Sequence, residues 1–407
     1  MNLSFFIARR YLLSKRKKNF INVISILSLI GVAFSTAALI IVLSVFNGLD
    51  DLLRSLNNSF DPEIKIEATK GKSFEINDDL LEKIELVEGV DIVTEVIEDY
   101  AYVRYRDANQ IVTLKGVSDN FVDQHRIDEK IIDGKLQLKK GDVPYAIVGR
   151  GVQYALSIAV GDDQYALQVY YINTVKSGSL DPAKLYSRKS ILPGASFSII
   201  QGFDENYVIV PLDFSKELLN YGNKRTSLEI KTNPDADILL VQRSLKDLLG
   251  STFSVLNADE QHKDLYRLMK MEKLFFFLAF SVLLGVSSIN IFFSLMMLAL
   301  DKKKDISVLT AMGADKSLIR RIFVTEGALI AISGTLLGLT LGGIFCWLQL
   351  RFGIISMGMQ TSVTEGYPIK VIPSDFLYTL LVVFLITFLT SFRPAVLAAR
   401  SASVQNL

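Results

Sequence analysis

Cysteine and histidine are almost absent from this chain of 407 residues. The single cysteine, Cys346, lies inside a long apolar run, so the polar part of the sequence has no disulfide to stabilise it. The two histidines, His125 and His262, lie far apart in sequence and lack neighbours at the spacing of zinc ligands. No G-x-x-x-x-G-K followed by Ser or Thr is present, which excludes the common phosphate-binding loop of ATPases, and no spacing selects a pair of acids for catalysis. We therefore expect a non-catalytic chain with no metal, no cofactor and no nucleic-acid partner.

Charged residues are also scarce in four long windows of the sequence. Half of all residues are hydrophobic and 21% are charged, yet few charges fall within residues 20–47, 271–300, 322–350 or 376–392. Each window approaches or exceeds the roughly 20 apolar residues that cross a bilayer. The first three are longer than necessary, so these helices either tilt or continue beyond the lipid. The sequence predicts an α-helical membrane protein with four transmembrane helices.

Lysine and arginine concentrate in the short segments beside these windows. They dominate the arm of residues 1–19, the loop of residues 301–321 and the tail of residues 393–407. The arm also has an apolar face, which suits an amphipathic helix at the membrane surface. By the positive-inside rule, these segments and both termini lie in the cytoplasm. Residues 48–270 and the loop of residues 351–375 then lie in the periplasm. Residues 48–270 carry 27 lysines and arginines against 36 aspartates and glutamates, a net charge of −9. The first window is too long for a cleaved signal peptide, so we expect it to remain as an anchor.

The periplasmic segment contains two strand–helix–strand patterns that are far apart in sequence. One lies between residues 63 and 97, and the other lies between residues 227 and 256, where Gly250 ends the helix. If the two pair in space, they form an α+β domain of two split βαβ units. Between them, at about residues 116–207, short alternating runs separated by turn residues predict an inserted all-β subdomain.

One stretch of this insertion differs in charge from its surroundings. Residues 173–193 contain one acid, Asp181, within an otherwise acidic segment. The stretch is either a solvated connection between strands or a protruding docking arm for an external partner, and long ordered loops are usually functional. The candidate docking residues are its basic side chains and prolines: Lys176, Pro182, Lys184, Arg188, Lys189 and Pro193.

The loop between the second and third windows combines lysines with an apolar stripe. Ile306, Leu309 and Met312 recur at helical spacing, so a short helix would present these three side chains to a partner. In a chain without a nucleotide-binding motif, such a loop is a candidate contact for a separate ATPase subunit. A charge in the stripe should prevent docking, so we expect Leu309→Asp to abolish association of the ATPase. The candidate coupling residues are Lys303, Lys304, Asp305, Ile306, Leu309, Met312 and Gly313.

Glycine recurs at every fourth position in the third window. Gly334, Gly338 and Gly342 would let another helix approach closely, unless they only reflect the glycine content of membrane helices. Glu326 in the same window is costly in lipid, and we expect it to bond to the basic loop rather than to carry ions. Three polar residues in the second window either bond to another helix or line a polar surface: Ser287, Ser288 and Asn290.

Four parts of the chain resemble a known family. They are FIARRYL at residues 6–12, LSVFNG at residues 43–48, KKDISVLTAMGA at residues 303–314, and Glu326-Gly327 with GTLLG at residues 334–338. With these segments, nearly the whole chain resembles the lipoprotein-releasing permeases of ABC transporters, the LolC/LolE type, within the FtsX/MacB-like permease superfamily.

The resemblance implies a subunit of the cell inner membrane with defined partners. Such a permease pairs with a second permease, identical or diverged, and with a cytoplasmic ABC ATPase. It moves no substrate through its spans but transmits motion to its periplasmic domain, which extracts acylated lipoproteins from the membrane and passes them to a periplasmic carrier. By position, residues 173–193 correspond to the family's carrier-binding hook.

A second hypothesis belongs to another functional class. Division-associated FtsX proteins are transmembrane signal transmitters whose outer domain controls a cell-wall hydrolase, and the size of the β-rich insertion favours lipoprotein release over this role. A MacB-like efflux subunit is disfavoured, because that type carries its ATPase on the same chain and only about twenty residues precede the first window. Crosslinking from residues 173–193 would capture a lipoprotein carrier in one case and a hydrolase in the other.

Overall fold

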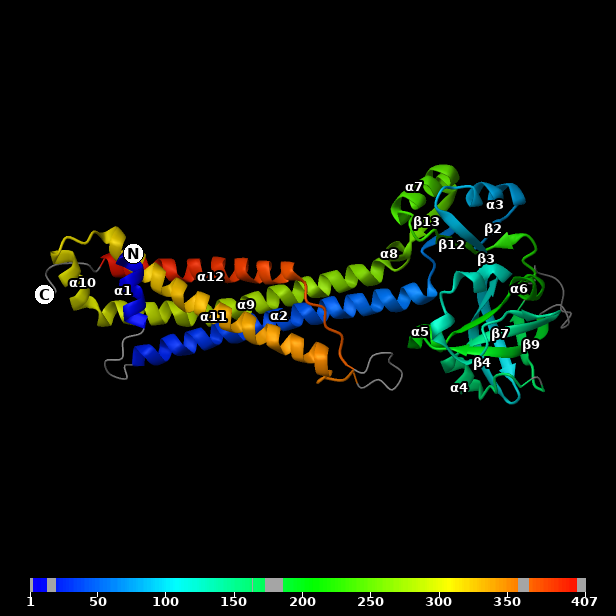
Figure 1. Cartoon of the computed structure of the whole chain (residues 1–407), viewed down its shortest axis with the longest axis horizontal. Coiled ribbons are helices and arrows are strands. Elements are labelled where there is room, and N and C mark those ends of the chain that lie inside the picture. Colours follow the sequence, from blue (N-terminus) through cyan, green and yellow to red (C-terminus); the bar gives the residue numbers. More distant parts are fainter. Residues whose placement is uncertain (1–2, 13–19, 163, 173–185, 358–365, 401–407) are drawn as a thin grey trace. The chain divides into compact units, whose positions relative to one another are not determined.

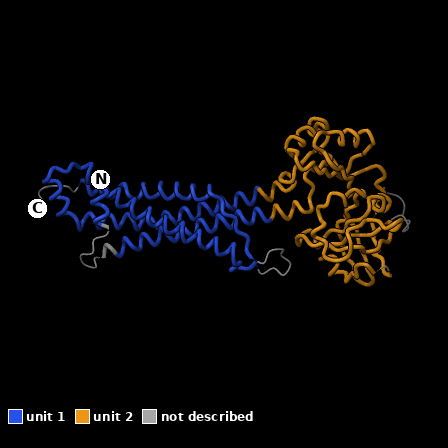
Figure 2. The backbone as a smooth tube through the Cα atoms, viewed as in Figure 1, with its two compact units in different colours: residues 1–52, 267–358, 364–407 blue, residues 53–266, 359–363 orange. Residues whose placement is uncertain are grey.

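The computed structural model describes residues 3–12, 20–162, 164–172, 186–357 and 366–400. The chain divides into two compact units (Figure 2). The membrane unit comprises residues 1–52, 267–358 and 364–407, and the sheet unit comprises residues 53–266 and 359–363. The division falls within two long helices, so each of these helices contributes residues to both units.

The membrane unit is built from long apolar helices. Among the described residues, four helices are long and apolar enough to cross a membrane, and each contains one of the predicted windows. They are α2 (Phe20–Phe60), α9 (Lys263–Asp301), α11 (Lys316–Phe352) and α12 (Pro373–Arg400). Two shorter helices accompany them: α1 (Leu3–Leu12), and α10 (Lys303–Ala311), which follows α9 and precedes α11 (Figure 1).

The helices α2 and α9 are much longer than a bilayer core requires, in agreement with their overlong windows. With 41 and 39 residues, α2 and α9 are each about 60 Å long at 1.5 Å per residue, roughly twice the thickness of a bilayer core. The helix that contains the fourth predicted span continues past residue 392, because α12 runs through Arg393 to Arg400. Arginine marks the edge of the lipid but can extend its charged head toward water, so it does not end the helix.

One apolar core joins the helices of the membrane unit. It includes Val32 of α2, Leu295 of α9, Ile306 of α10, Phe323 of α11 and Ala395 of α12. All five side chains are buried. The short helix α10 is therefore packed into the bundle rather than attached to it by loops alone.

The sheet unit contains one large mixed sheet. Its strands follow the order β13-β1-β12-β3-β4-β10-β7-β9-β5, with β6 added beside β7 and β8 beside β3 and β9. The strand bounds are β1 (Ile64–Ala68), β3 (Val90–Tyr105), β4 (Ala108–Val117), β5 (Ile131–Gly134), β6 (Lys139–Lys140), β7 (Val143–Gly149), β8 (Leu167–Ile172), β9 (Tyr186–Phe197), β10 (Tyr207–Pro211), β12 (Ser227–Thr232) and β13 (Phe253–Asn257). A separate pair consists of β2 (Phe74–Glu75) and β11 (Lys224–Arg225).

The first part of this sheet interleaves the two strand–helix–strand segments. Strand β12 lies between β1 and β3, and β1 lies between β12 and β13, with every neighbouring pair antiparallel. Helices α3 (Asp78–Glu85) and α7 (Ile238–Leu249) connect the strands and supply Ile84 and Leu245 to a shared apolar core. As predicted, α7 ends at Gly250, whose φ of +61° favours glycine.

The second part of the sheet closes on itself. Because β8 pairs with both β3 and β9, the strands β3, β4, β10, β7, β9 and β8 form a ring around a core that includes Val103, Leu114, Val148, Val169 and Val208. This ring uses strands that begin before residue 116. Two short helices, α4 (Arg150–Leu156) and α5 (Gln201–Asp204), lie within the predicted insertion, so residues 116–207 are not all-β as predicted; α6 (Leu212–Leu219) follows them. These helices are too short to show a clear helical period in the sequence. The short α8 (Ala258–Gln261) precedes α9.

Candidate functional site in the helix bundle

The predicted coupling segment folds as α10, but its apolar stripe divides. Ile306 is only 2% exposed and faces the core of the bundle, Leu309 is half-buried, and Met312 is 79% exposed. Val308, one helical turn before Met312, is also exposed. The prediction that Ile306 faces a partner is therefore wrong, because the bundle itself takes up this side chain.

Charged side chains surround the exposed face of α10. Lys303, Lys304 and Asp305 are exposed in its first turn. The helix stops where Gly313 adopts a φ of +94°, a conformation that favours glycine, and Asp315 then caps α11 by accepting a hydrogen bond from the Leu318 N–H. The result is an apolar patch with a charged rim on a helix whose other side is fixed in the bundle.

The three glycines of α11 that recur at every fourth position, Gly334, Gly338 and Gly342, face α2. A Cβ atom at Gly338 would lie 2.4 Å from the carbonyl oxygen of Ala33 and 2.7 Å from Cβ of Thr36. At Gly334 the corresponding distance to the carbonyl oxygen of Leu29 is 2.9 Å, and at Gly342 the distance to that of Ala37 is 3.2 Å. The contacts at Gly334 and Gly338 leave no room for a larger residue, and the contact at Gly342 is tight, so the two backbones pack directly on each other.

Small hydroxyl residues join α2 to α9. The hydroxyl groups of Ser35 and Ser287 lie 3.0 Å apart, and those of Ser25 and Ser294 lie 2.6 Å apart. Ser288 instead donates to the carbonyl oxygen of Leu284 in its own helix, at 2.8 Å. Of the alternatives for the polar residues of the second span, bonding between helices therefore holds for Ser287.

A polar cluster joins α2, α9 and α12 at the end of the bundle away from α10. Nδ2 of Asn47 donates to Oδ2 of Asp375 at 2.6 Å, and Nζ of Lys273 donates to Oδ1 of Asn47 at 2.6 Å. Lys273 also lies 3.5 Å from Oδ1 of Asp375. Beside this cluster, a Cβ atom at Gly48 would be 2.4 Å from the carbonyl oxygen of Pro368. Sequence reasoning did not assign this cluster, although Asn47 and Gly48 close one of the segments that carry the family resemblance.

Glu326 lies near the α10 end of the bundle. Its side chain is buried, and its Oε2 has no hydrogen-bond partner among the described residues. The ammonium group of Lys302, in the basic loop, lies 5.9 Å from the centre of the Tyr11 ring in α1. The expected bond between Glu326 and the basic loop is not formed among the described residues, where Lys302 lies beside Asp301 and Asp305 instead.

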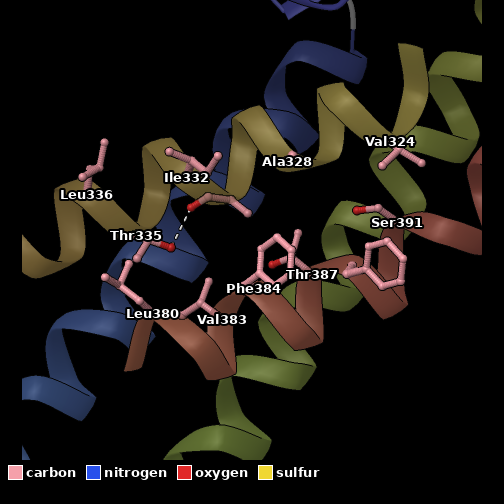
Figure 3. A pocket seen from close by; sticks show the side chains of 12 residues that line it. Val324, Ala328, Ile332, Thr335, Leu336, Leu380, Val383, Phe384, Thr387 and Ser391 are labelled. Carbon is pink, nitrogen blue, oxygen red and sulfur yellow. Dashed lines mark hydrogen bonds between the residues drawn. The ribbon is translucent and has the colours of Figure 1, made fainter. Parts of the chain in front are cut away.

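An apolar pocket of about 520 Å³ lies between α11 and α12 (Figure 3). Its walls include Leu336, Leu380 and Val383. Among the hydroxyl groups in its lining, Thr335 donates to the carbonyl oxygen of Ala331 at 2.7 Å, whereas those of Thr387 and Ser391 have no partner among the described residues. The pocket thus suits hydrocarbon rather than a polar ligand.

Only part of the candidate docking stretch falls within the described residues. Lys176, Pro182 and Lys184 lie outside them. Arg188, Lys189 and Pro193 belong to β9, not to a protruding loop, and Arg188 pairs with Tyr170 of β8. Every second side chain at the start of this strand is exposed: Tyr186, Arg188 and Ser190. Because exposed polar residues are also typical of loops, the sequence did not distinguish this part of the strand from a loop.

The described residues contain no group of three or more histidine, cysteine or acidic side chains that could hold a metal ion. His125 bonds to Asp128 and His262 bonds to Asp61, each through one ring nitrogen at 2.6 Å. Both histidines therefore have local structural partners.

Two families match the chain over most of its length. Residues 25–248 match the family described as MacB-like periplasmic core domain, and residues 275–402 match the family described as FtsX-like permease C-terminal. The first match covers more than half of the chain.

Three of the curated proteins similar to this chain are described as transmembrane proteins of a lipoprotein-releasing system. The lipoprotein-releasing system transmembrane protein LolC of Xylella fastidiosa (strain 9a5c) is 23% identical over 416 residues, covering 100% of this chain and 98% of that protein. LolC of Buchnera aphidicola subsp. Schizaphis graminum is 29% identical over 336 residues, covering 82% of this chain and 81% of that protein. The system's transmembrane protein LolE of Haemophilus influenzae is 23% identical over 422 residues, covering 100% and 99%.

Proposed function

We propose, from the premise that this chain belongs to the FtsX/MacB-like permease superfamily, that it couples ATP hydrolysis on a separate cytoplasmic subunit to the release of lipoproteins from the inner membrane. The lipoproteins pass to a periplasmic carrier, and the permease contributes motion rather than a channel. The names of the curated relatives support the lipoprotein substrate. The observation that carries the coupling role is α10, which exposes Val308 and Met312 on one side and buries Ile306 in the bundle on the other.

A force on α10 would reach the other helices through defined contacts. Ile306 shares a core with residues of α9 and α11, so α10 cannot shift without displacing them. The direct backbone contact at Gly338 connects α11 to α2, and the cluster around Asn47 connects α2, α9 and α12 at the opposite end. The bundle would therefore move as a small number of rigid bodies. Helices α2 and α9 would carry that motion along the chain into the sheet unit.

The remaining partners follow from the same proposal. A second permease, identical or diverged, would complete the transmembrane assembly, and acyl chains of membrane lipid would fill the pocket between α11 and α12. In the sheet unit, the helices α3 and α7 with β1, β3, β12 and β13 would form two split βαβ units.

The orientation in the membrane can be tested with protease. Both chain termini and α10 would lie in the cytoplasm, and the sheet unit would lie in the periplasm. Protease added to intact spheroplasts should then cleave the sheet unit, whereas protection there combined with cleavage in inverted vesicles would exclude this orientation.

The ATPase contact can be tested with one substitution and a matched control. Met312→Asp places a charge on the exposed face of α10 without disturbing the core, which makes it a sharper test than Leu309→Asp at a half-buried position. Leu239→Asp is the control, because Leu239 is also exposed but lies in α7 of the sheet unit. We expect Met312→Asp to lose ATPase copurification and ATP-dependent release from proteoliposomes, and Leu239→Asp to retain both. If the Met312→Asp variant binds the ATPase as well as the wild type does, α10 is excluded as the coupling element.

Carrier docking is a separate part of the proposal. We assign it to residues 173–193, the connection between β8 and β9 together with the first part of β9, because this stretch includes the candidate basic residues. A photocrosslinker at the exposed Arg188 should capture the soluble carrier, and the same group at the exposed Tyr154 of α4 should not. Capture of a cell-wall hydrolase instead would favour the signal-transmitting role.

A further inference from the structure

Helix α2 ends in the interior of the sheet unit. Its last residue, Phe60, is only 3% exposed. The Phe60 ring stacks on Phe203 with 4.1 Å between ring centres and meets the edge of the Tyr207 ring at 4.8 Å. A helix that only linked two parts of the chain would not need an aromatic side chain inserted into the core at its end.

Two cations fix the same residue from other directions. Nζ of Lys115, in β4, lies 4.4 Å from the centre of the Phe60 ring. Nη1 of Arg126 donates a hydrogen bond to the Phe60 carbonyl oxygen at 3.0 Å, at the end of the helix where carbonyl groups lack partners in the helix. The ring and the backbone of Phe60 are therefore held by side chains from different segments of the sheet unit.

Glu229 of β12 joins these two cations. Its Oε1 lies 2.7 Å from Nζ of Lys115, and its Oε2 accepts from Arg126. The side chains of Lys115 and Glu229 are both almost fully buried. Although burial alone would raise the pKa of Glu229, the two cations lower this pKa to about 2. Buried charges are expensive unless each is paired, so this network fixes its members in one arrangement.

The strands that hold Phe60 belong to different parts of the sheet. Strand β12 lies in the interleaved part, between β1 and β3, whereas β4 belongs to the closed ring. A displacement of Phe60 therefore acts on both parts at once.

The beginning of α9 is tied to the last turns of α2 and the residues that follow. Nε2 of His262 lies 2.6 Å from Oδ2 of Asp61, and Gln261 donates to the Pro62 carbonyl oxygen at 2.9 Å. One turn further along, Nδ2 of Asn57 donates to the Tyr266 hydroxyl at 3.3 Å. The two helices are therefore joined by hydrogen bonds where they enter the sheet unit, and sliding of one past the other would break these bonds.

We propose that Phe60, held by Lys115, Arg126 and Glu229, is the joint through which α2 and α9 drive the sheet unit. This inference rests on the proposed function for its direction of force, but every contact that defines the joint lies within residues 53–266 of the sheet unit. Phe60 is a positioning residue: it transfers movement to the sheet and touches no substrate. The joint links a bundle moved by an ATPase to the domain that handles the lipoprotein.

A matched pair of substitutions tests the joint. Phe60→Leu keeps an apolar side chain but removes the stacked ring and the contact with Lys115. Phe214→Leu is the control, because Phe214 of α6 is equally buried and has Nζ of Lys189 5.5 Å from its ring centre, but it belongs to the core of the ring of strands. Both variants lose a buried aromatic ring beside a lysine, and only one loses the joint.

The assay uses the full chain assembled with its ATPase and second permease in proteoliposomes. For Phe60→Leu we expect ATP turnover within about twofold of the wild type and lipoprotein release per ATP at least tenfold lower. For Phe214→Leu we expect release per ATP within about twofold of the wild type. The joint is excluded if Phe60→Leu releases as much per ATP as the wild type, or if Phe214→Leu loses as much as Phe60→Leu.

A second measurement separates the joint from the proposed function. Amide hydrogen exchange of β4 and β12 is followed in the assembled complex with and without ATP. We expect ATP to change the protection of these strands in the wild type and in Phe214→Leu, but not in Phe60→Leu. If the wild type shows this change yet releases no lipoprotein, the proposed substrate is wrong and the joint stands; an equal change in Phe60→Leu excludes the joint whatever the substrate.

Discussion

The two units of this permease are held together by different forces. In the sheet unit, large apolar side chains such as Tyr105, Phe197 and Ile97 are fully buried. In the membrane unit, many large side chains such as Phe34 and Phe384 face outward, and glycine and serine occupy several of the contacts between helices beside the apolar core. Lipid is as apolar as leucine, so a large apolar residue in a span gains little by turning inward. In the sheet unit, which is surrounded by water, a large apolar side chain gains stability by turning inward.

This difference teaches which contacts decide the structure of each unit. The membrane unit depends on close backbone approach, as at Gly338, and on a few polar bonds. The sheet unit depends on filling its interior, and there it tolerates two buried cations because both Lys115 and Arg126 contact the carboxylate of Glu229. Substitutions can therefore be chosen that damage one unit and leave the other intact.

The largest effect is expected from Glu229→Gln in the sheet unit. Without the carboxylate, Lys115 and Arg126 remain largely buried with no opposite charge, which should destabilise the unit by about 3–5 kcal/mol. Hydrogen exchange of β12 amides measures the loss, and the helices of the membrane unit should keep their protection. Asp79→Asn is the control, because the pair of Asp79 with Lys83 is exposed and its loss should cost less than about 0.5 kcal/mol. Equal losses from both substitutions would contradict the assignment.

The next effect should be confined to the membrane unit. Gly338→Val would drive its side chain into the backbone of α2, because even a Cβ atom would lie 2.4 Å from the Ala33 carbonyl oxygen. We expect a loss of about 3 kcal/mol in the unfolding of the helices in detergent. Gly343→Val lies five residues further along the same helix, and a Cβ atom there would meet nothing within 4 Å. If Gly343→Val is as damaging as Gly338→Val, glycine in α11 serves helix flexibility rather than packing.

Much of the architecture could be predicted from the sequence because the signals are local. The four spans follow from the length of apolar runs, and α7 follows from helical spacing that ends at Gly250. The predicted stripe on α10 was only half right, because periodicity indicates which residues share a face but not whether Ile306 packs against the same chain or a partner. The glycine spacing in α11 predicted a close contact, but the sequence did not identify α2 as the other helix.

What could not be predicted depends on residues far apart in sequence. Closure of the ring requires β8 to pair with both β3 and β9, and no local pattern in Leu167–Ile172 specifies two partners. The cluster of Asn47, Lys273 and Asp375 joins positions more than 300 residues apart at its extremes. Phe60 follows a polar stretch at the end of α2, so nothing local distinguishes it from a surface residue.

A smaller effect should reveal the connection between α2 and α9 through its pH dependence. The bond to Asp61 raises the pKa of His262 above its ordinary 6.5, and the nearby Lys65 opposes this change. A histidine whose pKa is raised on folding contributes stability that is complete below its unfolded pKa and is lost as the pH rises through the folded value. The sheet unit should therefore lose about 0.5 kcal/mol of unfolding free energy as the pH rises from about 6 to 8. His262→Gln should remove that dependence. If the unfolding free energy of the variant depends on pH as that of the wild type does, protonation of His262 does not contribute to stability.

The smallest effect tests whether polar bonds between the helices add to the close packing of the membrane unit. The Ser35 and Ser287 hydroxyl groups lie 3.0 Å apart, and such bonds in membrane proteins contribute about 0.6 kcal/mol on average. Ser35→Ala, Ser287→Ala and the double substitution form a cycle whose interaction term should be near that value when unfolding is measured in detergent. Ser281→Ala is the control, because that hydroxyl donates to the Phe277 carbonyl oxygen of its own helix at 2.7 Å. An interaction term near zero would mean that close packing, and not this hydrogen bond, holds α2 against α9. The membrane unit would then differ from the sheet unit in packing alone, with no contribution from this polar bond.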